Sequence, residues 1–261
     1  MNKKIAILTL YYNNYNYGGL LQSYALQRII NMLGHDAVQI SYKLETGYPG
    51  WSLVKSTLKK PLAYIFHQLK YGRWFDKYLA RQKKLELFVD QIPHTEVVTA
   101  STIANLIERY DCFICGSDQI WNPVGWQPTL FLNFVPSEKV KISYAASIAR
   151  DNLTDEQFEF IRTYIKDFTA VSVREKNSAD MLNQKYPDLN VQNMPDPVFL
   201  LEESEWENLI HRRNNPEAFI FAYFLGNENT NREKALKYAK KVGIKIIFAA
   251  YLEYPQFVWE K

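Results

Sequence analysis

The sequence predicts a parallel α/β fold, and three observations support that prediction. Apolar runs of strand length recur along the 261 residues, and stretches with helical spacing of apolar residues separate them. Polar or glycine-bearing segments follow several of these runs, as expected where the strands of such a fold turn into helices. Hydrophobic residues make up 47% of the chain and charged residues 23%, a balance typical of a soluble globular protein with a sizeable core.

The first elements alternate regularly. The run KIAILTL, residues 4–10, predicts a buried strand, because it is too short for a secretory signal and has no cleavage site. Residues 18–34 predict a helix that ends at Gly34, a residue suited to a helix C-cap. Residues 36–42 predict the second strand, and a basic, aromatic insertion that we expect to be mostly helical interrupts the pattern over residues 45–92.

The alternation then resumes. We expect a helix over residues 99–110, capped by Ser101 or Thr102, and strands at 111–116 and 139–147. Residues 154–168 predict an amphipathic helix with acidic residues in its first turn. A strand at 170–175, a helix at 177–186 and a strand with a turn within 190–201 complete this region.

Two lobes of unequal size are expected. Residues 1–207 would form the first lobe, and the polar segment 208–216, which contains a proline, reads as a linker. Residues 217–261 predict one β-α-β unit, which one helix cannot cover on both faces. We expect this unit to be the start of a second, truncated lobe; the alternative is that it completes the first sheet.

The cysteines and histidines predict no metal or redox centre. Cys112 and Cys115 lie three residues apart in a predicted strand, so their side chains should point to opposite faces as ordinary buried thiols. No histidine falls in the three polar loops described below, and no acids have metal-ligand spacing. We therefore expect no metal and no cofactor. No segment is long and apolar enough to cross a bilayer, so a cytoplasmic location is expected.

Three polar loops follow predicted strands, where open parallel sheets bind ligands. In the first, Gly18 and Gly19 at a helix start would let backbone N–H groups approach an anion such as phosphate. The alternative is a tight turn that needs glycine only for its backbone angles.

The third loop carries Arg174. The N–H donors of its planar guanidinium suit a carboxylate or phosphate ligand; the alternative is an ion pair with a neighbouring acid. Asp196, between two prolines, favours a rigid turn before a ligand contact.

The second loop carries the densest set of candidates. Gly116 permits close approach, Ser117 and Gln119 offer hydrogen bonds, and Asp118 can act as a base or hold a sugar hydroxyl. Trp121 can stack on the face of a sugar. The alternative is structural, with Asp118 capping a helix and Trp121 packed in the core.

Taken together, these segments resemble the polysaccharide pyruvyl transferase family. The resemblance rests on the order and spacing of NYGGLLQSYALQ, GSDQIWNP, SYAASIA, SVREKNSAD and MPDPVFLL, which span roughly residues 5–201. It implies Rossmann-like parallel-sheet lobes in a GT-B-like architecture, and transfer of a pyruvyl group from phosphoenolpyruvate, as donor substrate, onto two hydroxyls of a sugar. Arg174 matches the family's arginine and is the expected donor clamp, with Asp118 as the second catalytic candidate. Asn16, Gln22 and Ser147 lie in the matching motifs and join the expected substrate-binding residues.

One departure from the family pattern bears on activity. Such families carry a Ser-x-His type segment in the second lobe, and the chain given ends at Lys261 before any such segment. The resemblance therefore implies that this form is catalytically incomplete. Two alternatives remain open, a GT-B-like glycosyltransferase that uses a nucleotide sugar and a non-catalytic glycan-binding or scaffold protein.

The net charge of +3 is unevenly distributed. Residues 55–84 contain nine Lys or Arg and one acid, Asp76. A lipid-linked glycan acceptor would fit a basic, aromatic segment 51–84 that rests on the inner face of an anionic membrane, although a solvated helical hairpin is the alternative. No nucleic-acid signature is present, so that partner is not expected. Apolar sheet surface left on the second lobe makes a homo-oligomer a further expectation.

Overall fold

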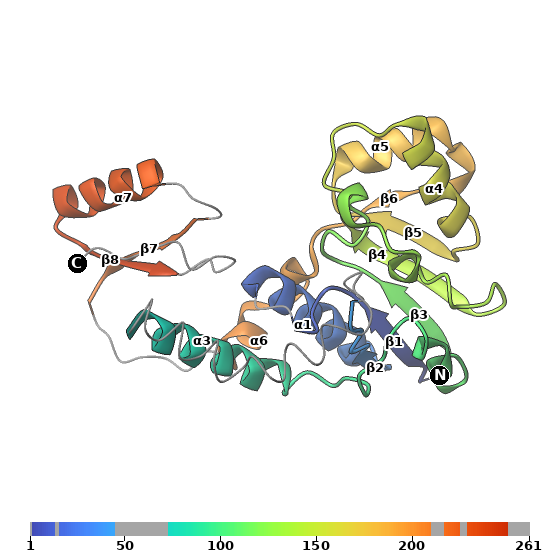
Figure 1. The fold of residues 1–261 in the computed structure, drawn as a ribbon, viewed down its shortest axis with the longest axis horizontal. Helices are drawn as coiled ribbons and strands as arrows, with labels where there is room; N and C mark the ends of the chain where they lie inside the picture. The colour runs from blue at the N-terminus through green and yellow to red at the C-terminus, as the bar shows by residue number, and fades with distance from the viewer. Residues whose placement is uncertain (1, 14–15, 45–72, 210–216, 225–228, 250–261) are drawn as a thin grey trace, which may run out of the picture. The chain divides into compact units, whose positions relative to one another are not determined.

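A computed structural model describes residues 2–13, 16–44, 73–209, 217–224 and 229–249 (Figure 1). The chain divides into two compact units, Met1–Glu202 and Glu203–Lys261. The sequence placed the end of the first lobe at residue 207, slightly after the observed division between Glu202 and Glu203. Most of the predicted linker falls outside the described residues.

The first unit contains a six-stranded parallel sheet with helices in its connections. Its elements are β1 (Lys4–Leu8), α1 (Tyr17–Met32), β2 (Asp36–Gln39), α3 (Arg73–Val89), η1 (Ile103–Arg109), β3 (Cys112–Cys115), η2 (Pro123–Gly125), η3 (Pro128–Phe131), β4 (Val140–Ala146), α4 (Asp155–Ile165), β5 (Ala170–Val173), α5 (Lys176–Lys185), η4 (Pro187–Leu189), β6 (Gln192–Asn193) and η5 (Pro197–Phe199). The strands lie in the order β2-β1-β3-β4-β5-β6. The α/β class is as predicted, and this unit is a Rossmann-like lobe.

Hydrophobic cores cover both faces of the sheet. In β1, Ile5 and Ile7 pack with the apolar side of α1, whereas Ala6 and Leu8 belong to the larger cluster that includes buried residues of α4 and α5. A strand buried on both faces needs apolar side chains at consecutive positions, which explains the unbroken apolar runs in the sequence. β1 pairs with β2 on one side and β3 on the other.

The cysteines of β3 point to opposite faces, as predicted. Cys112 packs in the core on the α1 side, and Cys115 packs in the larger core. Both are free and buried. They are therefore structural thiols rather than a redox pair.

Helix ends follow local side-chain chemistry. Asn16 caps α1, and Gly34 follows its last turn with φ of +87°, as the sequence predicts. Thr154 and Gln157 form a capping box at the start of α4. The helix expected at 99–110 is instead the 3₁₀ helix η1, and its capping was wrongly predicted: the Thr102 hydroxyl oxygen accepts a hydrogen bond from the Thr99 backbone N–H rather than from the helix.

The second unit contains α6 (Glu203–Glu207), β7 (Phe219–Tyr223), α7 (Asn229–Val242) and β8 (Lys245–Ala249). β7 and β8 form a parallel pair, so the β-α-β unit is present as predicted. Phe219 and Phe221 are 48% and 64% exposed, which leaves apolar side chains of β7 outside the core of this unit.

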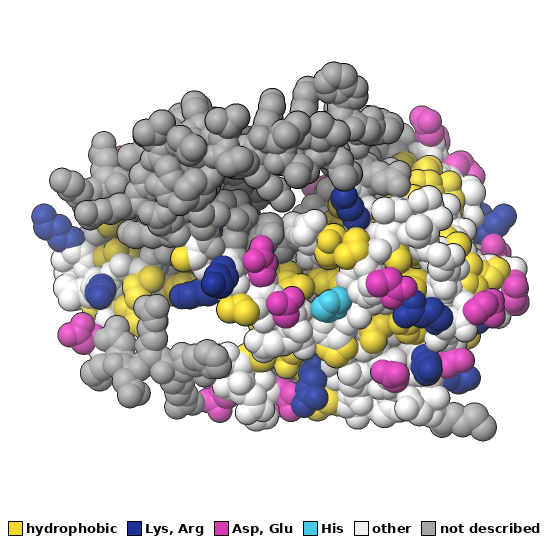
Figure 2. All heavy atoms as spheres, turned by 60° about the horizontal axis from the view of Figure 1, so that its bottom comes forward, with side chains coloured by type: hydrophobic (Ala, Val, Ile, Leu, Met, Phe, Trp, Pro, Cys, Tyr) yellow, Lys and Arg dark blue, Asp and Glu magenta, His cyan; other side chains and the backbone are white. Residues whose placement is uncertain are grey.

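Much of the basic insertion, residues 45–72, lies outside the described residues, and α3 is its described helix. Leu85, Phe88 and Val89 of α3 pack with Tyr11 and Leu20 beside α1. On the face that Figure 2 draws, basic and acidic side chains are interspersed among the described residues. No helix within the described ranges is long and apolar enough to span a membrane.

Candidate active site

Polar side chains from four neighbouring strands meet at the carboxyl edge of the sheet. Asp118 follows β3, Ser147 follows β4, Arg174 and Glu175 follow β5, and Asp196 follows β6. All strands run in the same direction, so their carboxyl ends lie along one edge, where open α/β sheets bind their ligands. The sequence-predicted catalytic pair, Arg174 and Asp118, is thus brought to one region.

Arg174 forms ion pairs with two carboxylates. Its Nε donates to Glu175 Oε1 at 3.2 Å, and its Nη1 donates to Asp196 Oδ2 at 3.0 Å. The structure therefore shows the ion pairs with neighbouring acids that were the alternative to a ligand-binding role for Arg174. The Arg174 side chain is 28% exposed, and within the described part of the chain its Nη2 has no hydrogen-bond partner. That nitrogen leaves two N–H donors for a ligand.

Asp118 lies beside this ion-pair cluster. Burial raises the pKa of its carboxyl group; the nearby Arg174 guanidinium lowers that pKa and the Asp196 carboxylate raises it. Asp118 Oδ1 accepts a hydrogen bond from the adjacent Gln119 N–H at 2.8 Å, so its carboxylate does not cap a helix as the structural alternative supposed. Its backbone has φ of +64° and its carbonyl accepts from Ser147 N–H.

Glu175 links Ser147 to Arg174, and sequence reasoning missed it. The buried Ser147 hydroxyl donates to Glu175 Oε1 at 2.6 Å, the same oxygen that accepts from Arg174. Glu175 occupies the N-cap position of α5, yet its side chain makes no capping hydrogen bond. Its Oε2 is buried without a hydrogen-bond partner among the described residues. The only signal in the sequence was its position next to Arg174 at a strand end.

Gly116 and Ser117 make contacts inside the sheet and not at an open surface. Gly116 has φ of +115°, and a Cβ added there would lie 2.2 Å from the carbonyl oxygen of Tyr144 in β4. The peptide bond between Gly116 and Ser117 is cis. Ser117 is fully buried, and its hydroxyl donates to the Ala145 carbonyl at 2.7 Å. We correct the expectation accordingly: the close approach that Gly116 permits is to β4, and the Ser117 hydroxyl is already used inside the protein.

Gln22 and Asn16 are also engaged within the protein. The buried Gln22 side chain accepts from Ser117 N–H and donates to Thr9 Oγ1, while Thr9 Oγ1 donates to the Ser117 carbonyl. This network ties the start of α1 to the ends of β1 and β3. The Asn16 side chain accepts from the N–H groups of Gly18 and Gly19 at 2.8 and 3.5 Å. The first turn of α1 is therefore partly capped by its own chain, which corrects the picture of open amides awaiting an anion.

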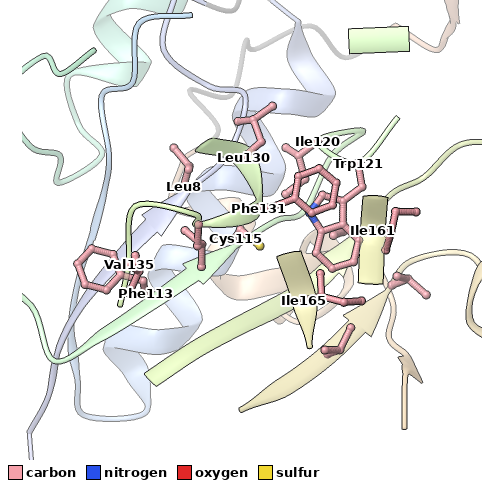
Figure 3. Packing of buried hydrophobic residues seen from close by; sticks show 14 of the residues in the cluster. Leu8, Phe113, Cys115, Ile120, Trp121, Leu130, Phe131, Val135, Ile161 and Ile165 are labelled. Carbon is pink, nitrogen blue, oxygen red and sulfur yellow. The ribbon is translucent and has the colours of Figure 1, made fainter. Parts of the chain in front are cut away.

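Trp121 lies in the core, as the structural alternative described. It is fully buried and its ring stacks on Phe131, with centroids 5.2 Å apart and an interplanar angle of 2° (Figure 3). A buried ring with this neighbour offers no open face to a sugar, so we withdraw it from the binding candidates. Gln119 is exposed at the same loop, and its side-chain oxygen accepts from Asn122.

A separate cavity of about 240 Å³ lies beyond the ends of β1 and β2. It is lined by Thr9, Leu10, Tyr12, Asn13, Tyr42 and Leu44. None of these was a sequence-predicted site residue; the run YYNN after β1 was the available signal. Among the residues that the structure describes, no group of His, Cys, Asp and Glu side chains is arranged to hold a metal ion.

Comparison with known proteins identifies the family. No curated protein matches the chain. A similar solved chain, described under substrate-directed dual catalysis of dicarbonyl compounds by diketoreductase, shares 10% identity with a TM-score of 0.23, which is too low to carry an argument. That alignment covers 97% of this chain and 66% of the other. The family model described as polysaccharide pyruvyl transferase matches residues 16–260, almost the whole sequence, and the chain therefore belongs to the polysaccharide pyruvyl transferase family.

Proposed function

We propose that this protein transfers a pyruvyl group from phosphoenolpyruvate to a sugar of a polysaccharide or its precursor. Two sugar hydroxyl oxygens bond to the central carbon of the donor, whose bond to the phosphate oxygen breaks. One hydroxyl proton ends on the donor methylene, which becomes a methyl group, and the other leaves with inorganic phosphate. The product is a cyclic ketal of pyruvate, and the balance requires no further reactant.

The match of residues 16–260 to the family is the observation that carries this proposal. The family is one of transferases, and the matched range includes both Asp118 and Arg174. Their common location at the carboxyl edge of the sheet adds support, because open α/β sheets bind their ligands at that edge.

Asp118 is our candidate for the base that accepts a proton from an acceptor hydroxyl. Burial raises its pKa and thereby makes its carboxylate a stronger base than an exposed aspartate. The hydrogen bond from the Gln119 backbone N–H and the nearby Arg174 guanidinium both oppose this rise in pKa. An ionised carboxylate near a sugar also accepts hydrogen bonds from the hydroxyls that it does not deprotonate.

Arg174 is our candidate for one contact to the donor, through its Nη2 donors. The carboxylates of Glu175 and Asp196 pair with this single guanidinium and Asp118 lies nearby, so acidic groups outnumber basic groups in the cluster. A donor with both phosphate and carboxylate groups therefore needs further positive charge from residues outside the cluster. In this proposal Glu175 and Asp196 hold the guanidinium in place rather than bind the donor.

The decisive experiment combines an activity assay with donor binding. The chain is incubated with phosphoenolpyruvate and a panel of bacterial polysaccharide fragments, and phosphate release is measured together with the acceptor's gain of one pyruvate less one water. Any transfer that the parent chain catalyses should be lost in Asp118→Asn and kept in Asp180→Asn, which changes an exposed acid of α5. Calorimetry should show donor binding that Arg174→Ala weakens and that Arg162→Ala, which removes a partly exposed ion pair with Asp188, leaves intact.

Other outcomes would redirect the assignment. Transfer from a nucleotide sugar with no use of phosphoenolpyruvate would identify a glycosyltransferase. Glycan binding without binding of either donor would identify a non-catalytic scaffold. The proposal holds only if phosphate release and ketal formation occur together.

The acceptor and its location form a finer part of the proposal. We propose a sugar or lipid-linked glycan acceptor met at the cytoplasmic face of a membrane, with the basic segment 51–84 against anionic lipid. Residues 51–72 lie outside the described residues, so the support is their composition alone. Sedimentation with anionic vesicles at low salt, reversed at high salt, is the expected result; failure to sediment contradicts it.

A further inference from the structure

We propose that the cavity beyond β1 and β2 is a binding site for one uncharged sugar ring of the acceptor. This inference rests on the proposed function and names the acceptor subsite within it. The residues that line the cavity, hereafter the β1–β2 pocket, are Thr9, Leu10, Tyr12, Asn13, Tyr42 and Leu44.

The chemistry of the β1–β2 pocket matches a carbohydrate. Two tyrosines and two leucines provide apolar surface for the C–H face of a pyranose, and Asn13 adds an amide that both donates and accepts hydrogen bonds. The structure gives the hydroxyls of Tyr12 and Tyr42 no hydrogen-bond partner among the described residues. Mixed aromatic and hydrogen-bonding walls are what an amphipathic ring with several hydroxyls requires.

The charge of the described lining argues against the donor, and the volume of the pocket argues against a nucleotide sugar. Among the described residues that line the pocket there is no Lys, Arg or His, so they supply no cation for a phosphate or carboxylate. Its volume of about 240 Å³ is below the roughly 300–1,000 Å³ of pockets for drug-sized ligands. One sugar ring suits this space better than a complete nucleotide sugar. The β1–β2 pocket therefore fits the acceptor and not the donor.

The position of the pocket supports the same conclusion. Thr9 follows β1, which neighbours β3 in the sheet, and its hydroxyl donates to the carbonyl of Ser117, the residue before Asp118. In strand order, the pocket at β2 and β1 comes first, Asp118 at β3 next and Arg174 at β5 last. The spacing of adjacent strands is about 4.8 Å, so Asp118 is roughly one strand from the pocket. The proposed base thus lies between the proposed acceptor and donor contacts.

The test is a binding measurement that needs no turnover. Saturation-transfer NMR with the methyl glycosides of glucose, galactose and mannose would be applied to the chain at millimolar concentrations. Leu44→Trp puts a larger side chain into the lining of the pocket and should weaken binding about tenfold or more. Leu33→Trp is the matched control, because Leu33 is exposed at the opposite end of α1.

A second variant guards against an effect of misfolding. Asn13 has φ of +54°, which glycine adopts without strain, so Asn13→Gly removes the amide and keeps the backbone. We expect it to weaken glycoside binding several-fold with an unchanged unfolding midpoint. Equal binding by the parent, Leu44→Trp and Leu33→Trp, or no saturable binding of any glycoside to the parent, overturns the proposal.

These results separate the pocket from the overall function. If Leu44→Trp abolishes glycoside binding but no phosphoenolpyruvate-dependent transfer is found, the sugar site stands and the proposed reaction fails. If transfer occurs and Leu44→Trp leaves both glycoside binding and the acceptor KM unchanged, the reaction stands and the pocket assignment fails.

Discussion

Gly116 shows how one residue sets the geometry of the carboxyl edge. Any side chain at this position would collide with the backbone of β4, since a Cβ would lie 2.2 Å from the Tyr144 carbonyl oxygen. Backbone atoms at the centre of a sheet cannot move aside as the end of a long side chain can. The loop that carries Asp118 therefore depends on the absence of a side chain two residues earlier.

We predict that Gly116→Ala destabilises the protein by about 3 kcal/mol or more, because a steric clash adds to an unfavourable positive φ. Urea denaturation followed by circular dichroism measures this loss in the free energy of unfolding. Gly34→Ala is the control: Gly34 also has a positive φ, but a Cβ added there would meet no atom within 4 Å, so only about 1–2 kcal/mol should be lost. Similar losses in both variants would show that the contact with Tyr144 contributes nothing.

The carboxyl group of Asp118, our candidate base, should also make the stability of the protein depend on pH. Because burial raises its pKa in the folded state, the folded protein keeps this proton at pH values where the unfolded chain has released it. The contribution of Asp118 to stability is therefore present at low pH and is lost as pH rises from the unfolded value of about 3.9 through the raised folded value.

We predict that Asp118→Asn is at least as stable as the parent at neutral pH, while pyruvyl transfer is lost. Asparagine tolerates the φ of +64° at this position, so the backbone need not change. The free energies of unfolding of the two proteins should be similar in acid and should diverge in favour of the variant as pH rises. A parent that instead gains stability over the variant with rising pH would mean that the attraction to Arg174 exceeds the cost of burial.

At the scale of the element, β3 shows why two cysteines in a C-x-x-C sequence remain separate. Side chains three positions apart in a strand point to opposite faces, and the structure places Cys112 and Cys115 in different cores. Burial, with a smaller effect of the Asp111 carboxylate, raises the pKa of Cys112 to about 11, and burial also raises the pKa of Cys115. Few thiolates are therefore present near neutral pH.

We predict that neither thiol reacts with a maleimide or a disulfide reagent in the folded protein at pH 8, since the thiolate is the reactive form. Both should react at once in denaturant, which serves as the positive control. Mass spectrometry of the intact chain would count the labels. Rapid labelling of the folded chain, or an internal disulfide between these residues, would contradict the arrangement of β3.

The regular elements were predictable because each depends on a local pattern. Unbroken apolar runs indicated strands buried on two faces, and Gly34 indicated the end of α1. Strand ends were less predictable, since they depend on pairing: β2 ends at Gln39 rather than continuing to residue 42, and beyond it Tyr42 forms only an isolated bridge with Val98. The apolar residues of segment 99–110 have helical spacing, which predicted a regular helix. The structure has the 3₁₀ helix η1 there instead.

The candidate site was only partly predictable, because the sequence does not show which way a loop side chain faces. The polar loops at the strand ends were located correctly, and they bring Asp118 and Arg174 to the same edge. The burial of Ser117 and Trp121 depends on contacts with β4 and Phe131, which lie in later elements of the chain. Glu175 and the β1–β2 pocket were missed for the same reason, since each is defined by neighbours from other elements.

At the scale of the whole molecule, the two units differ in how well their sheets are covered. In the first unit, every residue of β3 is buried, with a hydrophobic core on each face. In the second unit, only Ala222 is buried in β7, and none of the β8 residues is buried among those whose burial is described. A two-stranded sheet with so little burial has a weak basis for independent stability.

We predict that native-state hydrogen exchange protects the amides of β1 and β3 more than those of β7 and β8, because local opening costs less where fewer apolar contacts are broken. Mass spectrometry of peptides from both units would measure the difference, and the experiment should be run at two protein concentrations. Protection of β7 that rises with concentration would mean that a second copy covers Phe219 and Phe221, since association stabilises the state that it binds. Equal, concentration-independent protection in both units would contradict the prediction and would require that the apolar side chains of β7 be covered within one chain.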